Sequence, residues 1–484
     1  MTGGPNVILL ILDTLRAKNV SCYGYPAKTT PHLDTFANEN ILFKHAFSAA
    51  TWTIPSHASM LTGLYPSQHR IENIRADRRF NRALVTLPEA LRSAGYRTAA
   101  FSQNMLFSRE NHLDDGFDEF FNVDELLNSR SQTRFVRQVA DGSQGPWRLA
   151  ARYVRKMIAP RLVLDNMYDW IKARGRQEPF FLMANALAPH FPWTVPPDIL
   201  LRQEGFNPKY LLKPDFVTLK KQWEFNAGTR EVTETHRRIW RVLYDASIVH
   251  VDREVGRFLR RLGRWRGWEN TIVVITADHG EMLGDYRDIV GHTLSLHDNL
   301  IHVPLIVRHP DYSPGLKVEG VVQTLDLYPS VLEWSGAPMD GIPSAQTQRP
   351  GLAGAVARAS DPGGIAFAEE DYTDSYDVIE KLLSVNPAMD PTKYPRQQLA
   401  AHSATHKYLW CDDRPGEFYN LVTDPDELHN LINTAVDRSA LADLQIALDV
   451  WRSNLEIFPP RLVDDAAEMD ETVIERLRAL GYVA

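Results

Sequence analysis

Short apolar runs that end in metal-binding side chains constrain this chain more than any other feature. Residues 7–12 form a continuous apolar run followed by Asp13, and residues 272–275 form another that leads to Asp278 and His279. Such runs are typical of strands buried on both faces of a parallel sheet. Open α/β sheets build their ligand sites at the carboxyl ends of these strands. The two runs therefore predict that Asp13, Asp278 and His279 meet at one edge of a central sheet.

Strand and helix patterns alternate through most of the chain. Residues 97–101 and 180–184 are further apolar strands, and amphipathic helices are expected at residues 84–94 and 231–263. Repeated strand–helix units favour an α/β fold with a doubly wound, mostly parallel sheet flanked by helices. We therefore expect one catalytic α/β domain over residues 1–340.

The pattern changes after about residue 340. Gly, Pro and Ala are frequent in residues 341–364, as in a linker or a loop. Short strand patterns follow at residues 365–367, 406–410 and 417–421. A helix pattern lies near residues 437–455. These elements indicate a second, smaller unit with an antiparallel sheet.

Residues 128–176 hold eleven Lys or Arg residues and only three Asp. Their apolar residues recur with roughly helical spacing. We interpret this basic insertion as a lid with a solvated face, and the alternative is a contact with an acidic substrate or a membrane surface. The first interpretation is preferred because Pro160 is expected to end the helix early.

Composition excludes several classes of protein. The net charge of −8 argues against a general nucleic-acid binder. With only Cys22 and Cys411, a disulfide framework or a cysteine zinc site is not expected. No apolar run approaches the ~20 residues of a membrane span. The first apolar run begins at Val7, which leaves no room for a signal peptide of roughly 15–30 residues, so we expect a cytoplasmic protein.

Residues 50–66 contain the start of a helix. Pro55 suits the first helical turn, and Gly63 with Pro66 can end the helix. Thr53 is expected just before this N-terminus, where free N–H groups and the helix dipole favour negative charge. The Thr53 hydroxyl could cap the helix or attack an anionic ester, and the residues alone leave both roles open.

Six motifs follow one another along nearly the whole chain. They are residues 5–13, Thr53-Ile54-Pro55-Ser56-His57 with Leu61-Thr62-Gly63, Gly116-Phe117-Asp118, Pro189-His190-Phe191-Pro192, Asp278-His279-Gly280-Glu281, and Asp424-Pro425-Asp426-Glu427 with Asn430-Leu431. In this order they resemble the motifs of the sulfatase family, within the alkaline phosphatase superfamily. The resemblance implies that residues 365–484 form a small C-terminal α+β subdomain.

The metal ligands come from this motif set. Asp13, Asp278 and His279 offer two carboxylates and an imidazole, and the Thr53 oxygen is a candidate fourth ligand. Such a set suits a divalent ion of the Mn²⁺, Zn²⁺ or Mg²⁺ kind. The sulfatases proper usually carry a second Asp and an Asn where this chain has Thr14 and His279. The added imidazole moves the preference from Ca²⁺ towards a transition metal.

The resemblance also implies contacts with the substrate. Family members with two zinc ions carry an extra Asp–His pair that is missing around His190, so we expect one metal ion. His190 and His292 resemble positions that stabilise anionic oxygens or protonate a leaving group. His57 stands where the family has Arg, and Ser102 and Asn104 stand near its Lys and His. We expect His57, Asn104, His190 and His292 to contact a substrate in a pocket with little cationic charge.

Thr53 stands where the sulfatases hold a Cys or Ser that matures to formylglycine. Threonine cannot form that aldehyde, so an ester on Thr53 must be resolved by direct attack of water or another acceptor. Threonine-dependent phosphodiesterases, phosphomutases and phosphoglycerol transferases of the superfamily resolve phosphate esters in this way. We therefore expect metal-dependent hydrolysis or transfer of a small phosphate-type mono- or diester, or a related anionic ester, with Thr53, His190 and His292 as catalytic residues.

Two alternatives stay open at this point. The first is a sulfuric ester hydrolase or sulfuryl transferase that works without formylglycine, because it would share every motif. The second is a non-catalytic binding protein on the same scaffold. Such a protein is expected to have lost its metal ligands, and this chain retains all of them.

Overall fold

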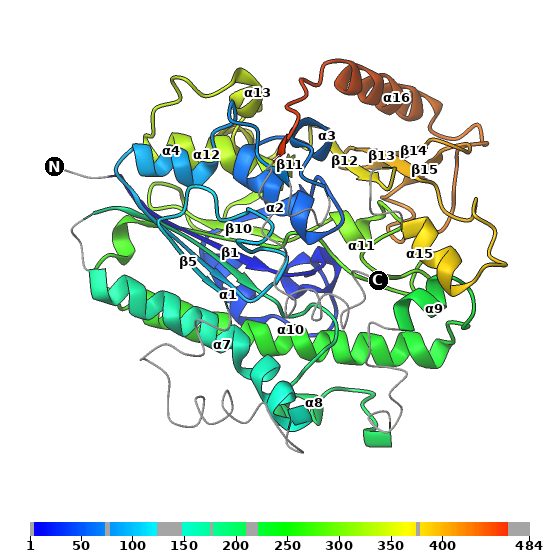
Figure 1. Ribbon diagram of the computed structural model, residues 1–484, viewed down its shortest axis with the longest axis horizontal. Helices are drawn as coiled ribbons and strands as arrows, with labels where there is room; N and C mark the ends of the chain where they lie inside the picture. Colours follow the sequence, from blue (N-terminus) through cyan, green and yellow to red (C-terminus); the bar gives the residue numbers. More distant parts are fainter. Residues whose placement is uncertain are drawn as a thin grey trace.

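The computed structural model describes residues 4–72, 78–122, 148–174, 178–209, 221–373 and 378–462. An eight-stranded sheet lies at its centre, in the order β11-β2-β10-β7-β1-β6-β4-β5 (Figure 1). Its strands are β1 (Asn6–Leu12), β2 (Ile41–Phe47), β4 (Arg97–Ser102), β5 (Glu119–Asn122), β6 (Phe180–Ala186), β7 (Thr271–Thr276), β10 (Leu305–Arg308) and β11 (Lys317–Gln323). Only β10 runs antiparallel to its neighbours in this sheet. The predicted doubly wound, mostly parallel sheet is confirmed.

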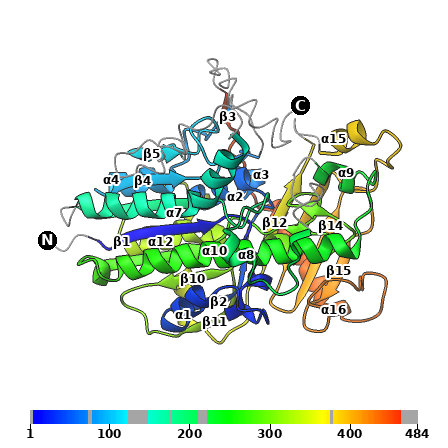
Figure 2. The ribbon, with the colours of Figure 1, turned by 90° about the horizontal axis from the view of Figure 1, so that it is seen from below.

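Helices cover both faces of this sheet (Figures 1 and 2). The long ones are α1 (Pro31–Glu39), α2 (Thr53–Thr62), α4 (Leu87–Ser93), α7 (Arg148–Arg174), α10 (Glu234–Leu262) and α12 (Leu327–Ser335). Successive side chains of a strand point to opposite faces, so β1 contributes to two cores. Leu10 packs in the core under α1, α7 and α10, whereas Leu9 and Ile11 pack in the core under α2, α4 and α12.

The parallel strands bring distant parts of the chain to one sheet edge. β1 pairs with both β6 and β7, and β6 pairs with β4. In this register Asn185 of β6 lies beside Ile11 on one side and beside Ser102 on the other. The loops after these four strands therefore begin at the same edge, which is where open α/β sheets place their sites.

A separate four-stranded antiparallel sheet follows, as expected for the C-terminal part. Its strands, in spatial order, are β12 (Ala366–Asp371), β13 (Gln397–His402), β14 (His406–Cys411) and β15 (Glu417–Asn420). Helix α16 (Arg438–Ser453) packs on β13 and β14, and α15 (Val378–Val385) packs on α9 (Gln222–Asn226). Strand β13 was not predicted, because its Gln and Ala residues carry little strand preference.

The remaining elements are short. The helices are α3 (Pro66–His69), α8 (Pro197–Leu200), α11 (Asp298–Ile301), α13 (Ser344–Thr347) and α14 (Leu352–Ala357), and the 3-10 turns are Ala17–Asn19, Ser21–Tyr23, Trp268–Asn270 and Thr324–Asp326. Two-residue strands pair β3 (Arg78–Arg79) with β16 (Arg461–Leu462) and β8 (Met282–Leu283) with β9 (Val290–Gly291). Among the described helices, none is long and apolar enough to cross a membrane.

The basic insertion departs from expectation at Pro160. Residues 128–147 lie outside the described residues, but α7 continues through Pro160, so the prediction that this proline ends the helix is wrong. Proline costs a helix interior about 3 kcal/mol through the lost N–H and a steric clash. Val163, Met167 and Ile171 of α7 are buried in the core against the sheet and α10. Their burial holds the second half of the helix in place.

Candidate active site

Two loops at the sheet edge hold the predicted metal ligands. Asp13 directly follows β1, and its N–H donates to the Ala186 carbonyl of β6 at 3.0 Å. Asp278 lies two residues after β7, and its Oδ1 accepts the N–H groups of Thr14 at 3.2 Å and His279 at 3.0 Å. Thr14 has a φ of 62°, a left-handed conformation that turns its N–H towards Asp278. Backbone contacts thus fix both carboxylates next to each other.

Asp13, Asp278 and His279 form a buried cluster with donor atoms facing one another. One ligand atom from each residue lies within 4.8 Å of the other two, and all three residues are fully buried. Asp13 Oδ1, Asp278 Oδ2 and His279 Nε2 have no hydrogen-bond partner among the described residues. Buried polar atoms are almost always satisfied. A divalent cation would satisfy all three at once, so the residues fit the predicted metal.

The protonation tendencies of these groups agree with such a site. Burial raises the pKa of Asp13 well above its ordinary value, and the charge of Asp278 adds to this effect. Burial opposes ionisation of Asp278 as well, but His279 and His57 outweigh it and lower its pKa. Burial lowers the pKa of His279 to about 4, which keeps the imidazole in the neutral form that ligates metals.

Thr53 lies against this cluster as the first residue of α2. The N-cap residue is Trp52, so the Thr53 hydroxyl does not cap the helix. Asn104, two residues after β4, donates from its Nδ2 to both Thr53 Oγ1 at 3.1 Å and Asp13 Oδ2 at 2.5 Å. Its Oδ1 accepts the Leu106 N–H at 2.8 Å, which fixes the orientation of the amide. One amide nitrogen therefore joins the Thr53 oxygen to a carboxylate of the buried cluster.

His57 is enclosed one helical turn below Thr53. Its Nδ1 donates to the Thr53 carbonyl at 2.8 Å and lies 3.7 Å from Asp278 Oδ2. Its Nε2 lies 3.3 Å from Asn185 Nδ2, and its ring stacks on Phe107 with centroids 4.7 Å apart. Burial lowers the pKa of His57. His57 therefore supports the backbone of Thr53, and its contact with the substrate stays a prediction.

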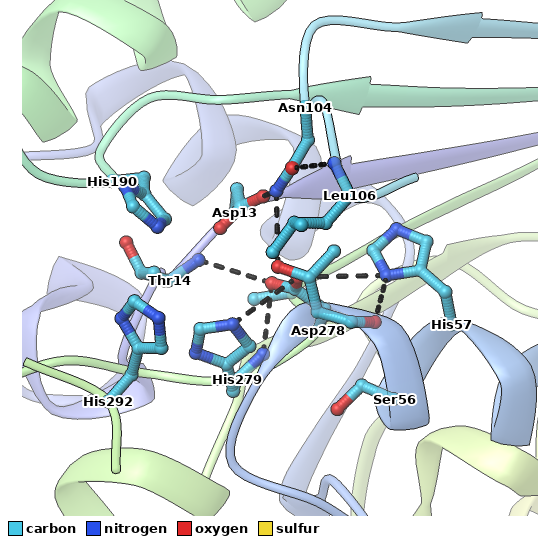
Figure 3. Close-up of polar contacts among 12 residues, drawn as sticks. Asp13, Thr14, Ser56, His57, Asn104, Leu106, His190, Asp278, His279 and His292 are labelled. Carbon is cyan, nitrogen blue, oxygen red and sulfur yellow. Dashed lines mark hydrogen bonds and ion pairs between the residues drawn. The ribbon is translucent and has the colours of Figure 1, made fainter. Parts of the chain in front are cut away.

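Three imidazoles lie on one side of the carboxylates, and His57 lies on the other (Figure 3). The ring centroid of His292 lies 5.0 Å from the ring centroid of His190 and 4.8 Å from that of His279. His190 Nδ1 donates to the Phe191 carbonyl, and burial lowers the pKa of His190 to about 4. His190 and His292 thus come together beside the metal-ligand cluster. Ser102 does not join them, since its hydroxyl donates to the Asn104 carbonyl at 2.7 Å.

Two residues of the site were not assigned a role from the sequence. Asn185 Nδ2 donates to Asp13 Oδ2 at 3.1 Å, and the signal for it was a buried amide within the apolar strand β6. Glu281 belongs to the motif that carries Asp278. Its Oε1 lies 3.3 Å from His292 Nδ1, and its Oε2 has no partner among the described residues. A carboxylate two residues after His279, within the same motif, was the available signal.

Comparisons with known proteins agree with this geometry. The family model described as Sulfatase matches residues 5–337. A "Sulfatase" of Formosa agariphila is 24% identical over 99% of this chain and 94% of its own length. The "Multifunctional alkaline phosphatase superfamily protein PehA" of Trinickia caryophylli is 23% identical over 92% of this chain and 95% of its own.

A solved structure shares the architecture. The phosphonate monoester hydrolase of Agrobacterium radiobacter aligns with a TM-score of 0.70 at 20% identity, over 92% of this chain and 96% of that chain. The family model covers every residue of the buried cluster, together with Thr53, Asn104, His190 and His292. Because the Sulfatase family model matches more than half of this chain, the chain belongs to the sulfatase family.

Proposed function

We propose that this protein is a metal-dependent hydrolase or transferase that uses Thr53 as a nucleophile on a small anionic ester of the phosphate type. The supporting observation is the shared amide of Asn104, which bonds both the Thr53 hydroxyl and Asp13. A threonine hydroxyl is a weak nucleophile unless a metal or an adjacent base activates it. Thr53 also begins a ten-residue helix, where the free N–H groups favour an anionic group.

Asp13, Asp278 and His279 would hold the metal, with Thr53 Oγ1 as a fourth ligand. A divalent ion bound there supplies Lewis acidity, which lowers the pKa of a ligated hydroxyl and neutralises an anionic oxygen. Asn104 orients the Thr53 hydroxyl. In the first step Thr53 Oγ1 forms a bond to the central atom and the bond to the leaving oxygen breaks. Water or another acceptor then takes the group from Thr53 and restores the hydroxyl.

His190 and His292 are proposed to serve the leaving and attacking oxygens. The Nδ1 of His190 is engaged by the Phe191 carbonyl, and that of His292 lies beside Glu281. We assign the contact with the substrate to the Nε2 atom of each ring. From there the rings can stabilise an anionic oxygen or move a proton, as general acids and bases do.

Charge supports an ester with one negative charge. Within the described part of the chain, no lysine or arginine forms an ion pair with Asp13, Asp278 or Glu281. Burial also lowers the pKa values of His57 and His190. The described residues around the cluster thus offer little cationic charge besides a bound metal. A phosphodiester or phosphonate monoester suits this site better than a dianionic phosphate monoester.

Sulfate esters are the second candidate, because they also carry one charge. One relative is the "N-acetylglucosamine-6-O-sulfatase" of Bacteroides thetaiotaomicron, whose name states the sulfated substrate of that protein. A panel of aryl phosphodiester, phosphonate monoester, phosphate monoester and sulfate ester separates the candidates. We expect kcat/KM to be at least about tenfold higher for the first two, a difference of about 1.4 kcal/mol in transition-state free energy. A preference for the sulfate ester would overturn the phosphorus assignment.

Substitution of either histidine tests its role. We expect His190→Ala and His292→Ala each to lower kcat by about 10²–10⁴-fold, the range for loss of general acid–base groups. Little change in melting temperature is expected. His250→Ala is a matched control, since this buried histidine bonds the Met157 carbonyl at 2.8 Å, far from Thr53 in the fold. If His190→Ala and His292→Ala lower the melting temperature and leave kcat normal, as expected for the control, both histidines have only a structural role.

A further inference from the structure

One side chain of the C-terminal sheet contacts both segments that carry the proposed catalytic residues. This side chain is Glu370 of β12. We propose that Glu370 is a positioning residue, which holds the segment of Thr53 and the segment of His292 in their catalytic relation. The inference rests on the function proposed above and extends it to a residue outside the region matched by the family model, which ends at 337.

The contacts of Glu370 converge on one carboxyl oxygen. Oε1 accepts hydrogen bonds from Thr51 Oγ1 at 2.9 Å, from the Leu294 N–H at 2.9 Å and from the Tyr372 hydroxyl. Oε2 accepts one from Gln398 Nε2 at 3.1 Å. Glu370 is buried, so these bonds lie away from competing water.

The two bridged segments come from distant parts of the chain. Thr51 lies two residues before Thr53, and Leu294 lies two residues after His292. The carboxyl group of Glu370 therefore links β12 to the segment of Thr53 and to the segment of His292. Substrate-positioning contacts of this kind matter because a shift of about 1 Å in a reacting group can cost about 10²-fold in rate.

Leu294 supplies an independent sign that this loop is held by its contacts. Its φ is 75°, a left-handed conformation that a leucine rarely adopts. Its N–H donates to Glu370 and to the Tyr372 hydroxyl, the second at 2.7 Å. Residues in such conformations persist where the surrounding structure fixes them. Both groups that fix Leu294 belong to the C-terminal part of the chain.

The neighbouring residue Glu369 provides a matched control. Successive side chains of a strand point to opposite faces, and Glu369 accepts from Ser67 Oγ at 2.9 Å instead. Both carboxyls are buried, and burial raises the pKa of each to about 8. In the described part of the chain, the hydrogen bonds of Thr51 Oγ1 and the Leu294 N–H go to Glu370 and not to Glu369. Its removal should disturb the same strand without disturbing the two catalytic segments.

The experiment compares Glu370→Ala, Glu370→Gln and Glu369→Ala in the metal-loaded full chain. We expect Glu370→Ala to lower kcat by at least about tenfold with a change in KM below about threefold. Glu370→Gln should recover most of the rate, because the amide oxygen of the new side chain still accepts hydrogen bonds from Thr51 and Leu294. Gln398 can rotate its own amide so that its oxygen accepts a hydrogen bond from the new amide nitrogen. Glu369→Ala should lower the melting temperature while kcat stays within about twofold of wild type. Equal kinetic effects of Glu370→Ala and Glu369→Ala, or no recovery in Glu370→Gln, would overturn the proposal.

Thr51→Val keeps the test decisive if Glu370→Ala fails to fold. It removes one hydroxyl that donates to Glu370 and nearly conserves shape, so we expect a lower kcat, by about threefold or more, at an almost unchanged melting temperature. An unchanged kcat would contradict the positioning role. Thr53→Ala is measured alongside. Full activity in that variant would end the proposed function, whereas an inactive Thr53→Ala beside a normal Thr51→Val would end only the inference about Glu370.

Discussion

We expect the replacement of Thr53 with alanine to lower kcat by at least about 10³-fold, equivalent to about 4 kcal/mol of transition-state stabilisation. The change removes the hydroxyl that we propose forms the covalent bond to the ester. It also removes one of the two acceptors of the Asn104 amide and leaves Asp13 as the other. Steady-state kinetics with the best ester of the panel measure the loss. Circular dichroism and the melting temperature show whether the fold is kept.

Thr53→Ser is the matched variant for this experiment. It retains the oxygen and loses only the methyl group that restricts the rotamer, so part of the activity should remain. Thr51 is the competing hydroxyl nearest in the sequence, but it donates to Glu370 at 2.9 Å. Full activity in Thr53→Ala would contradict the nucleophile assignment.

We expect the replacement of Asp278 with alanine to abolish metal binding and, with it, activity. Among the described residues, Asp278 Oδ2 and Asp13 Oδ1 are the two carboxylate oxygens of the buried cluster that accept no hydrogen bond. Without Asp278 the cluster keeps one carboxylate and one imidazole, a set too small to hold a divalent ion tightly. Elemental analysis should find about one divalent ion per wild-type chain and almost none in the variant.

Asp252→Ala is the control for the metal experiment. This carboxyl is buried as well, but it accepts the N–H groups of His32 and Leu33 at the start of α1, remote from the cluster. We expect that variant to lose stability and to keep its metal. Equal metal content in wild type and Asp278→Ala would refute the ligand assignment.

Strand ends were the most informative feature of the sequence. The apolar runs before Asp13 and before Asp278 and His279 predicted that these residues meet, because the carboxyl ends of parallel strands lie at one edge of a sheet. In the structure, one ligand atom from each residue lies within 4.8 Å of the other two. The direction of β10 could not be read in this way, since a short apolar strand is compatible with either direction. It runs antiparallel to β7 and β2.

Contacts between elements far apart in the sequence could not be predicted from local sequence patterns. Asn185 acts on Asp13 only because β6 pairs with β1, and Glu370 reaches Leu294 only because two sheets meet. Helix α7 passes Pro160 because tertiary burial outweighs a local preference. The domain limits, the single metal ion and the cytoplasmic location stay predictions.

Trapping of the covalent intermediate tests the central claim most directly. Digestion after Lys44 and Arg70 releases a peptide of residues 45–70, and fragmentation distinguishes Thr53 from Thr51 within it. Protein quenched during turnover of the phosphodiester should carry a phosphoryl-type adduct on Thr53. The adduct should keep the second ester group of the phosphodiester, which sets its mass apart from that of a sulfuryl group. An adduct on another residue, or rapid turnover with Thr53 never modified, would contradict the account.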